Sequence, residues 1–108
     1  MATGGELTFS RRVLSEIAFR SAMEVPGVRG TSGDLMSGLI GRLKRGSAHR
    51  GINVSEDSRG LVFRIDLVIA QGGSIVDLGT EVQGKVGSQI KLMTGRDAVV
   101  NVKVTAIE

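Results

Sequence analysis

The stretch that decides the fold runs from Leu61 to Ile107. It begins Leu61-Val-Phe-Arg-Ile-Asp-Leu-Val-Ile-Ala70, where apolar and polar residues alternate before the run becomes almost wholly apolar. It ends Ala98-Val-Val-Asn-Val-Lys-Val-Thr-Ala-Ile107, which alternates in the same way. Because side chains along a β-strand point alternately to opposite faces, this pattern predicts a strand at each end of the stretch.

The segment between these strands has the spacing of an amphipathic helix. Ser74 is followed three residues later by Asp77, a capping box in which Asp replaces the commoner Glu. Thr94-Gly95 supplies a stop signal at the other end. Apolar residues recur between them at steps of three and four, which predicts one buried helix face. This stripe consists of Ile75, Leu78, Val82, Val86, Ile90 and Met93.

Three glycines interrupt this helix, at positions 79, 84 and 87. Each costs about 1 kcal/mol relative to Ala inside a helix. We therefore expect at least one of them to allow close packing against a neighbour.

The first half of the chain predicts fewer elements. Residues 6–9 alternate and read as a short opening strand, and Ser10 is a suitable N-cap for a helix that Pro26-Gly27 ends. Residues 51–70 predict an antiparallel hairpin that turns at Ser55–Gly60. The expected order is β-α-β-β-α-β, an α+β two-layer sandwich with a four-strand mixed sheet covered on one face by two helices. A ferredoxin-like strand order is our first hypothesis.

Length and composition bound the class of protein. The 108 residues suggest a single domain, residues 1–108, with a flexible basic glycine-rich insertion at about 29–50. The absence of Cys excludes disulfides, thiol catalysis and Cys-based metal sites and fits a cytoplasmic location. No signal peptide is visible, and no apolar run approaches the roughly 20 residues that span a bilayer. We therefore expect a soluble protein with no direct membrane insertion.

The basic excess lies in the first half, where residues 1–54 hold eight Lys and Arg against four Asp and Glu. It is densest after Gly38-Leu-Ile-Gly41, which matches the GxxG loop by which KH domains clamp a nucleic-acid backbone. A basic loop attracts phosphate of nucleic acid or of anionic lipid, and it can also be merely a solvated charged loop. The candidate interaction patch comprises Arg42, Lys44, Arg45, His49 and Arg50.

No catalytic arrangement follows from the other polar residues. Asp77 and Glu81 share a helix face and complement the helix dipole, while Asp66 lies in mid-strand. His49 is the only histidine, so no transition-metal site is expected. Gly72-Gly73 before a helix is only weak evidence for an anion site. We expect a protein that is not an enzyme, with no catalytic, metal-binding or cofactor-binding residues.

At family level, Ile17-Ala-Phe-Arg-Ser-Ala-Met-Glu-Val-Pro-Gly-Val28 resembles a segment typical of the alkaline shock protein family, also called envelope stress response proteins. The resemblance continues through Gly51-Ile-Asn-Val54 and Met93-Thr-Gly95 to the last Val-rich strand, so it covers nearly the whole chain. The basic insertion and the polar Gln71-Gly-Gly-Ser74 depart from the family pattern. The element order also resembles the cytoplasmic domain of cation-diffusion transporters, which bind metals through several histidines.

The resemblance implies a small cytoplasmic adaptor or scaffold protein in bacterial cell-envelope stress response or homeostasis. Such a protein would form homo-oligomers and would be held at the inner face of the cell membrane by a membrane-anchored protein partner. The alternative is a nucleic-acid-binding module that uses residues 38–50. Since the polar positions of Leu61 to Ile107 form no reactive arrangement, we expect the function to lie in the basic loop or on an exposed edge of the sheet.

Overall fold

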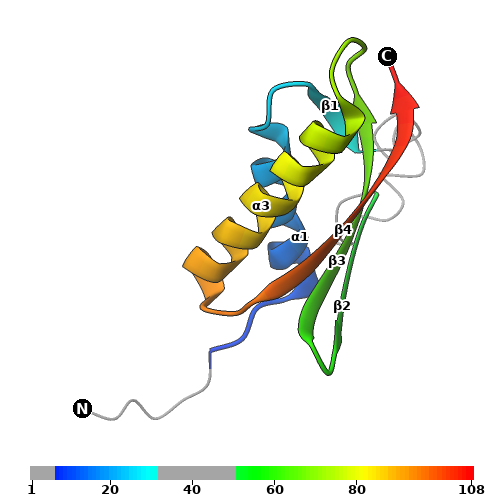
Figure 1. Cartoon of the computed structure of the whole chain (residues 1–108). Helices are drawn as coiled ribbons and strands as arrows, with labels where there is room; N and C mark the ends of the chain where they lie inside the picture. The colour runs from blue at the N-terminus through cyan, green and yellow to red at the C-terminus, as the bar shows by residue number, and fades with distance from the viewer. Residues whose placement is uncertain (1–6, 32–50) are drawn as a thin grey trace.

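The computed structural model describes residues 7–31 and 51–108. In these ranges two helices lie side by side on one face of a four-stranded sheet (Figure 1). The predicted α+β two-layer class is thus confirmed. In chain order the elements are α1 (Arg11–Met23), β1 (Val28–Thr31), β2 (Ile52–Asp57), β3 (Gly60–Ile69), α3 (Ile75–Thr94) and β4 (Ala98–Ile107).

The sheet is built around β3. Along one side of β3 run β2, which is antiparallel to its first half, and β1, which is antiparallel to its last residues. Along the other side runs β4, which is parallel to β3 over its whole length. The sheet is therefore mixed, as expected. The ferredoxin-like order is wrong, because β4 adjoins β3 directly and forms one edge of the described sheet.

The fourth strand lies in a different place from the one predicted. Residues 7–10 form no strand, and the Leu7 side chain is 82% exposed, although Phe9 packs against the core. The first strand is instead β1, which follows α1 and includes residues 29–31, assigned above to the insertion. A two-position alternation is too little to define a strand when no sheet edge is available to pair with it.

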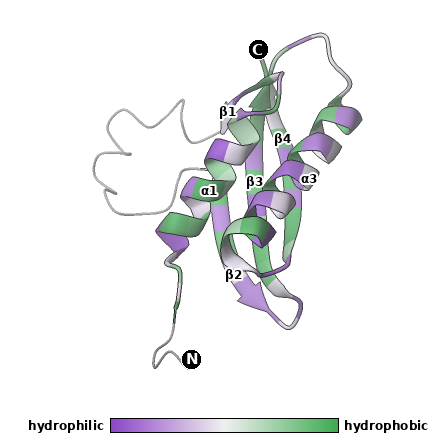
Figure 2. Ribbon diagram, turned by 90° about the vertical axis from the view of Figure 1, so that its left-hand side faces the viewer, coloured by the Kyte–Doolittle hydropathy of each residue, from purple (hydrophilic) through white to green (hydrophobic). Residues whose placement is uncertain are grey.

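Alternation along β3 accounts for the core. Phe63, Ile65 and Leu67 are fully buried against the helices, while Arg64 is exposed and Asp66 half-buried on the opposite face. Figure 2 shows this alternation of apolar and polar residues along the strands. The predicted hairpin is confirmed, since β2 pairs with the first half of β3.

Both helices begin at the predicted caps; α3 also ends at its predicted glycine, whereas α1 ends at Met23, shortly before Pro26-Gly27. The Ser10 Oγ accepts a hydrogen bond from the Val13 N–H at 3.1 Å, and the Ser74 Oγ accepts one from the Asp77 N–H at 3.2 Å. α3 ends at Gly95, which takes the left-handed conformation with φ of 76°. The middle of the predicted apolar stripe of α3 is buried, whereas its ends, Ile75 and Met93, are 46% and 57% exposed.

The helix glycines do not serve close packing against the described residues, 7–31 and 51–108. A Cβ placed at Gly79, Gly84 or Gly87 would meet none of their atoms within 4 Å, so that expectation is wrong for this part of the chain. The close approach occurs at Gly27, where a Cβ would lie 2.6 Å from the Leu78 Cδ1. This contact lies between the turn after α1 and the first turns of α3.

Candidate interaction surfaces

The basic patch predicted from sequence lies outside the described residues. The same is true of the GxxG segment, Gly38 to Gly41. The nucleic-acid alternative therefore stays a prediction. The patch consists of Arg42, Lys44, Arg45, His49 and Arg50.

The carboxylates of Asp66, Asp77 and Glu81 do not form one site. Asp77 and Glu81 are exposed on α3, which covers one face of the sheet. Asp66 lies on the other face, beside Lys103 in the register of β3 and β4, and its Oδ1 is buried with no hydrogen-bond partner among the described residues. Within residues 7–31 and 51–108, no three His, Cys, Asp or Glu side chains lie close enough to hold a metal ion.

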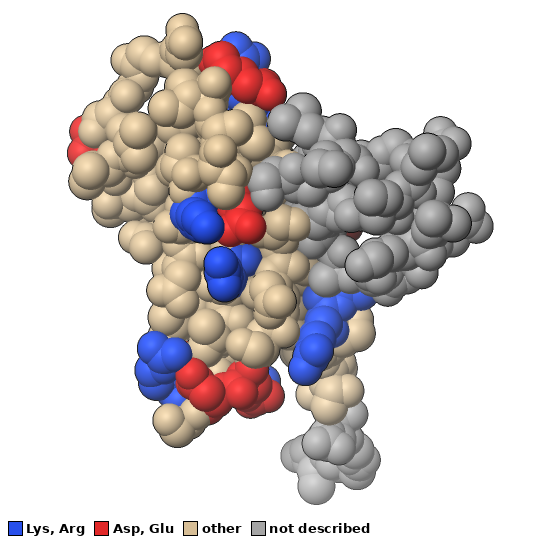
Figure 3. Space-filling view, turned by 90° about the vertical axis from the view of Figure 1, so that its right-hand side faces the viewer, with Lys and Arg blue, Asp and Glu red and all other residues tan. Residues whose placement is uncertain are grey.

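On the face of the sheet away from the helices, charged groups of both signs lie next to one another (Figure 3). Arg96 pairs with Glu56 across the end of the sheet, and Arg59 pairs with Asp57 at 2.7 Å. Hydrogen bonds from Arg59 hold the pKa of the Asp57 carboxyl below its usual range. Within each pair the opposite charges neutralise one another, so these pairs create no strong electrostatic field that would attract a charged ligand.

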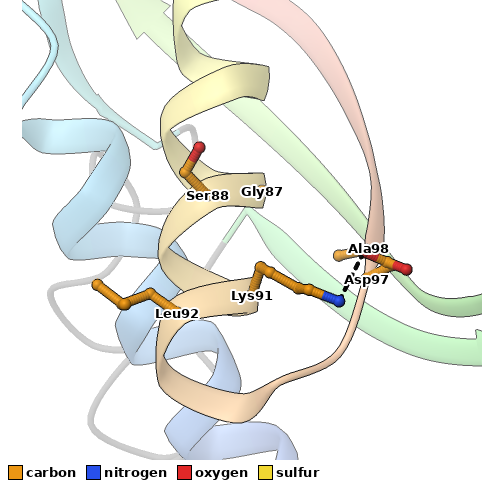
Figure 4. Close-up of a pocket in the computed structure, with 6 residues that line it drawn as sticks. All are labelled: Gly87, Ser88, Lys91, Leu92, Asp97 and Ala98. Atoms are coloured by element: carbon orange, nitrogen blue, oxygen red, sulfur yellow. Dashed lines mark ion pairs between the residues drawn. The ribbon is translucent and has the colours of Figure 1, made fainter.

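A hollow of about 520 Å³ lies between α3 and the start of β4. Lys91 crosses it from α3 to form an ion pair with Asp97 at 3.3 Å, while the Leu92 side chain points away from β4 (Figure 4). Sequence reasoning missed this hollow. The sequence feature that could have indicated it is Gly87, which has no side chain to fill the helix surface at that point. The lining residues are Gly87, Ser88, Lys91, Leu92, Asp97 and Ala98.

Next to the hollow lies the outer edge of β4. Val100, Val102 and Val104 point toward the helices, yet they are only partly buried, because α3 covers this edge strand incompletely. The Gln83 side chain reaches from α3 to this strand and donates a hydrogen bond to the Val100 carbonyl oxygen at 3.1 Å. The described part of the chain therefore has an apolar strand at the rim of its core.

Comparison with known proteins identifies the family. Residues 1–108 match the alkaline shock protein family, which is described as having a cell envelope-related function. This protein belongs to the alkaline shock protein family. The match covers every residue and confirms the resemblance found in the sequence. No curated protein matches this family member in sequence.

Solved structures similar to this family member support its fold. A MamM CTD with three substitutions has a TM-score of 0.54 and 17% identity, covering 88% of this chain and 93% of that chain. A MamM CTD with two substitutions has a TM-score of 0.52 and 15% identity, covering 88% and 92%. At this level of identity the likeness concerns the fold alone. Among the described residues, none of the helices is long and apolar enough to cross a membrane.

Proposed function

We propose that this alkaline shock family protein is an adaptor or scaffold that is not an enzyme and that acts in cell-envelope stress response or homeostasis. It works through self-association and through a membrane-anchored protein partner, which holds it at the inner face of the cell membrane. The observation that carries the proposal is the family match over residues 1–108, with its cell envelope-related function.

Exposed apolar side chains on α3 support a role in protein contact. Val76 is 76% exposed near the start of the helix, and Leu92 is 80% exposed near its end. Each costs free energy while it faces water, at roughly 25 cal/mol per Å² of apolar surface. A protein partner that covers them would recover that energy. Single exposed apolar residues are common on monomers, so the contribution of these two must be measured.

The direct test is cross-linking in the native cell, followed by identification of the captured proteins in the membrane fraction. We expect one membrane-anchored protein to be captured by the wild type and lost when Leu92 and Val76 are both replaced by Ser. The matched control is Glu81→Gln, which alters another exposed position of α3, outside the lining of the hollow, without adding or removing an apolar side chain.

Light scattering across a range of concentrations tests self-association separately. A chain that stays monomeric and captures no membrane protein would contradict the proposal. Capture that is unchanged in the double Ser variant would show that the partner does not depend on Val76 and Leu92.

A further inference from the structure

The hydrogen bonds of β3 determine which backbone groups of β4 are free. Asp66 donates its N–H to the Gly51 carbonyl at 2.7 Å, and Ala70 donates to the Gly27 carbonyl at 2.8 Å. Even-numbered residues of β3 thus bond toward β1 and β2. Because backbone groups of successive strand residues point to opposite sides, odd-numbered residues of β3 bond toward β4.

The register of β4 then identifies its outward groups. In a parallel ladder, only one residue of each facing pair bonds to the neighbouring strand. Asn101 lies beside Arg64 and Lys103 beside Asp66, and these two β3 residues bond away from β4. Asn101 and Lys103 are therefore the residues that bond inward to β3. Their neighbours bond outward, and the contact of Gln83 with the Val100 carbonyl agrees with that direction. The register shifts after Val104, which ends the straight edge. The residues with outward N–H and C=O groups are Ala98, Val100, Val102 and Val104.

This edge has few of the features that protect exposed strands, namely Lys103 and the register shift after Val104. Natural edge strands are kept short, or carry charges, proline or bulges, because an open edge pairs with another strand. On the other side of the sheet β1 has only four residues and a register shift, and β2 ends in Glu56 and Asp57. β4 has ten residues, no proline, and Lys103 as its only charged side chain.

We propose that two copies of this chain pair along β4, antiparallel, around a two-fold axis at Asn101. This inference rests on the self-association in the proposed function and adds the surface that performs it. With the axis there, Ala98 lies opposite Val104 of the second copy, and Val100 lies opposite Val102. Every outward residue of the straight edge then faces an outward residue, and each pair can exchange both N–H···O bonds once Gln83 releases the Val100 carbonyl oxygen. The two sheets become one.

The side chains on the open face fit this register. Asn101 meets Asn101 of the second copy in a pair without backbone bonds, where side chains are closest, and an amide both donates and accepts. Lys103 lies opposite Val99, so the two ammonium groups are about 13 Å apart along the strand, at 3.3 Å per residue. At that distance salt screens their repulsion. An axis at Lys103 would instead place the ammonium groups face to face.

The side chains on the helix side fit as well. Val104 of the second copy arrives opposite Ala98, which lines the hollow of about 520 Å³ beside Gly87. A Cβ at Gly87 would meet no atom of the described residues within 4 Å, so the hollow is open on this side of Ala98. The partly buried valines of the two copies continue one another and complete their burial. An interface built mainly on one strand is small, so the expected dimer is weak.

A single cysteine tests the axis, because the chain has no Cys of its own. We expect Asn101→Cys to form a disulfide-linked dimer under mild oxidation at concentrations where the wild type is dimeric. The matched control is Asn53→Cys, an exposed asparagine on β2 at the other side of the sheet, which should remain largely monomeric. Equal cross-linking of both variants, or of neither, in a protein that self-associates would refute the pairing and leave self-association standing.

A second pair of variants keeps the test independent of disulfide chemistry. Gly87→Glu places a charged side chain in the hollow, and we expect it to weaken dimerisation at least tenfold in sedimentation equilibrium. Gly84→Glu adds the same charge one turn away, outside the lining of the hollow, and should change the Kd less than twofold. Both changes replace a helix glycine, so neither should lower thermal stability. Equal effects of the two would refute the interface. A wild type that is monomeric at millimolar concentration would overturn this inference and the self-association together, whereas capture of a membrane partner would still support the adaptor role.

Discussion

Replacing Gly27 by Ala should be among the most costly single-methyl additions in this protein. Gly27 has φ of +100°, a conformation that L side chains rarely adopt. Its new Cβ would lie 2.6 Å from the Leu78 Cδ1, well inside van der Waals contact. Leu78 is only 8% exposed and belongs to the core, so it has little room to turn away.

A second glycine, Gly72, separates the cost of backbone strain from the cost of the clash with Leu78. Gly72 has the same φ of +100°, but a Cβ there would meet no atom within 4 Å in the part of the chain that the structure describes. The backbone strain of an L residue in this region is about 1–2 kcal/mol. The reduced entropy of the unfolded chain returns about 0.4–1 kcal/mol. Gly72→Ala should therefore cost about 1 kcal/mol. Gly27→Ala adds overpacking of about 1–3 kcal/mol, for a total of about 2–4 kcal/mol.

Urea denaturation at one low protein concentration measures these differences, since dimerisation would otherwise add to the apparent stability. The midpoint should fall further for Gly27→Ala than for Gly72→Ala, with an unchanged slope. In a Leu78→Ala background the extra cost at Gly27 should largely disappear, because the clashing atom has been removed. Equal midpoints for the two glycine variants would refute the argument that Gly27 is needed for its contact with Leu78.

Three other expectations concern caps, charges and the β4 edge. Ser74→Ala removes the N-cap acceptor of α3 and should lower the free energy of unfolding by about 1 kcal/mol in urea denaturation. Arg59→Ala should raise the pKa of Asp57 toward the ordinary 3.8, as followed by NMR titration. Since folding lowers that pKa, the wild-type pair stabilises the protein above this pH and loses its effect as pH falls below it. Gln83→Ala frees the Val100 carbonyl for a second copy and should tighten dimerisation several-fold in sedimentation equilibrium.

Much of the fold could be predicted because its main elements carry strong local patterns. β3 alternates in burial from Gly60 to Leu67 before it becomes wholly apolar, and α3 combines a cap, an apolar stripe and a terminal glycine. β1 could not be predicted, because it has only four residues, one of them Gly30, and exists through its pairing with the end of β3. In a strand that short, tertiary pairing outweighs intrinsic preference.

The candidate surface was harder to predict than the fold. The sequence predicts function in the basic loop or on an exposed edge of the sheet, but it does not identify the strand that forms this edge. The outward groups of Val100 and Val102 belong to the backbone, and the alternating sequence pattern is the same in a central strand as in an edge strand. The sequence predicts close packing at one or more of Gly79, Gly84 and Gly87, whereas a Cβ at any of the three would meet no described atom within 4 Å.

Position in the sheet gives two similar strands different roles. β3 and β4 come from one stretch, each has ten residues, and each alternates apolar with polar side chains. β3 has strands along both sides, so Phe63 and Ile65 are completely buried. β4 has a strand along one side only, so Val102, with the same orientation, remains half-exposed at the rim. The apolar residues of β3 are thus already used by the chain itself, while those of β4 remain available to a second copy without any change in the core.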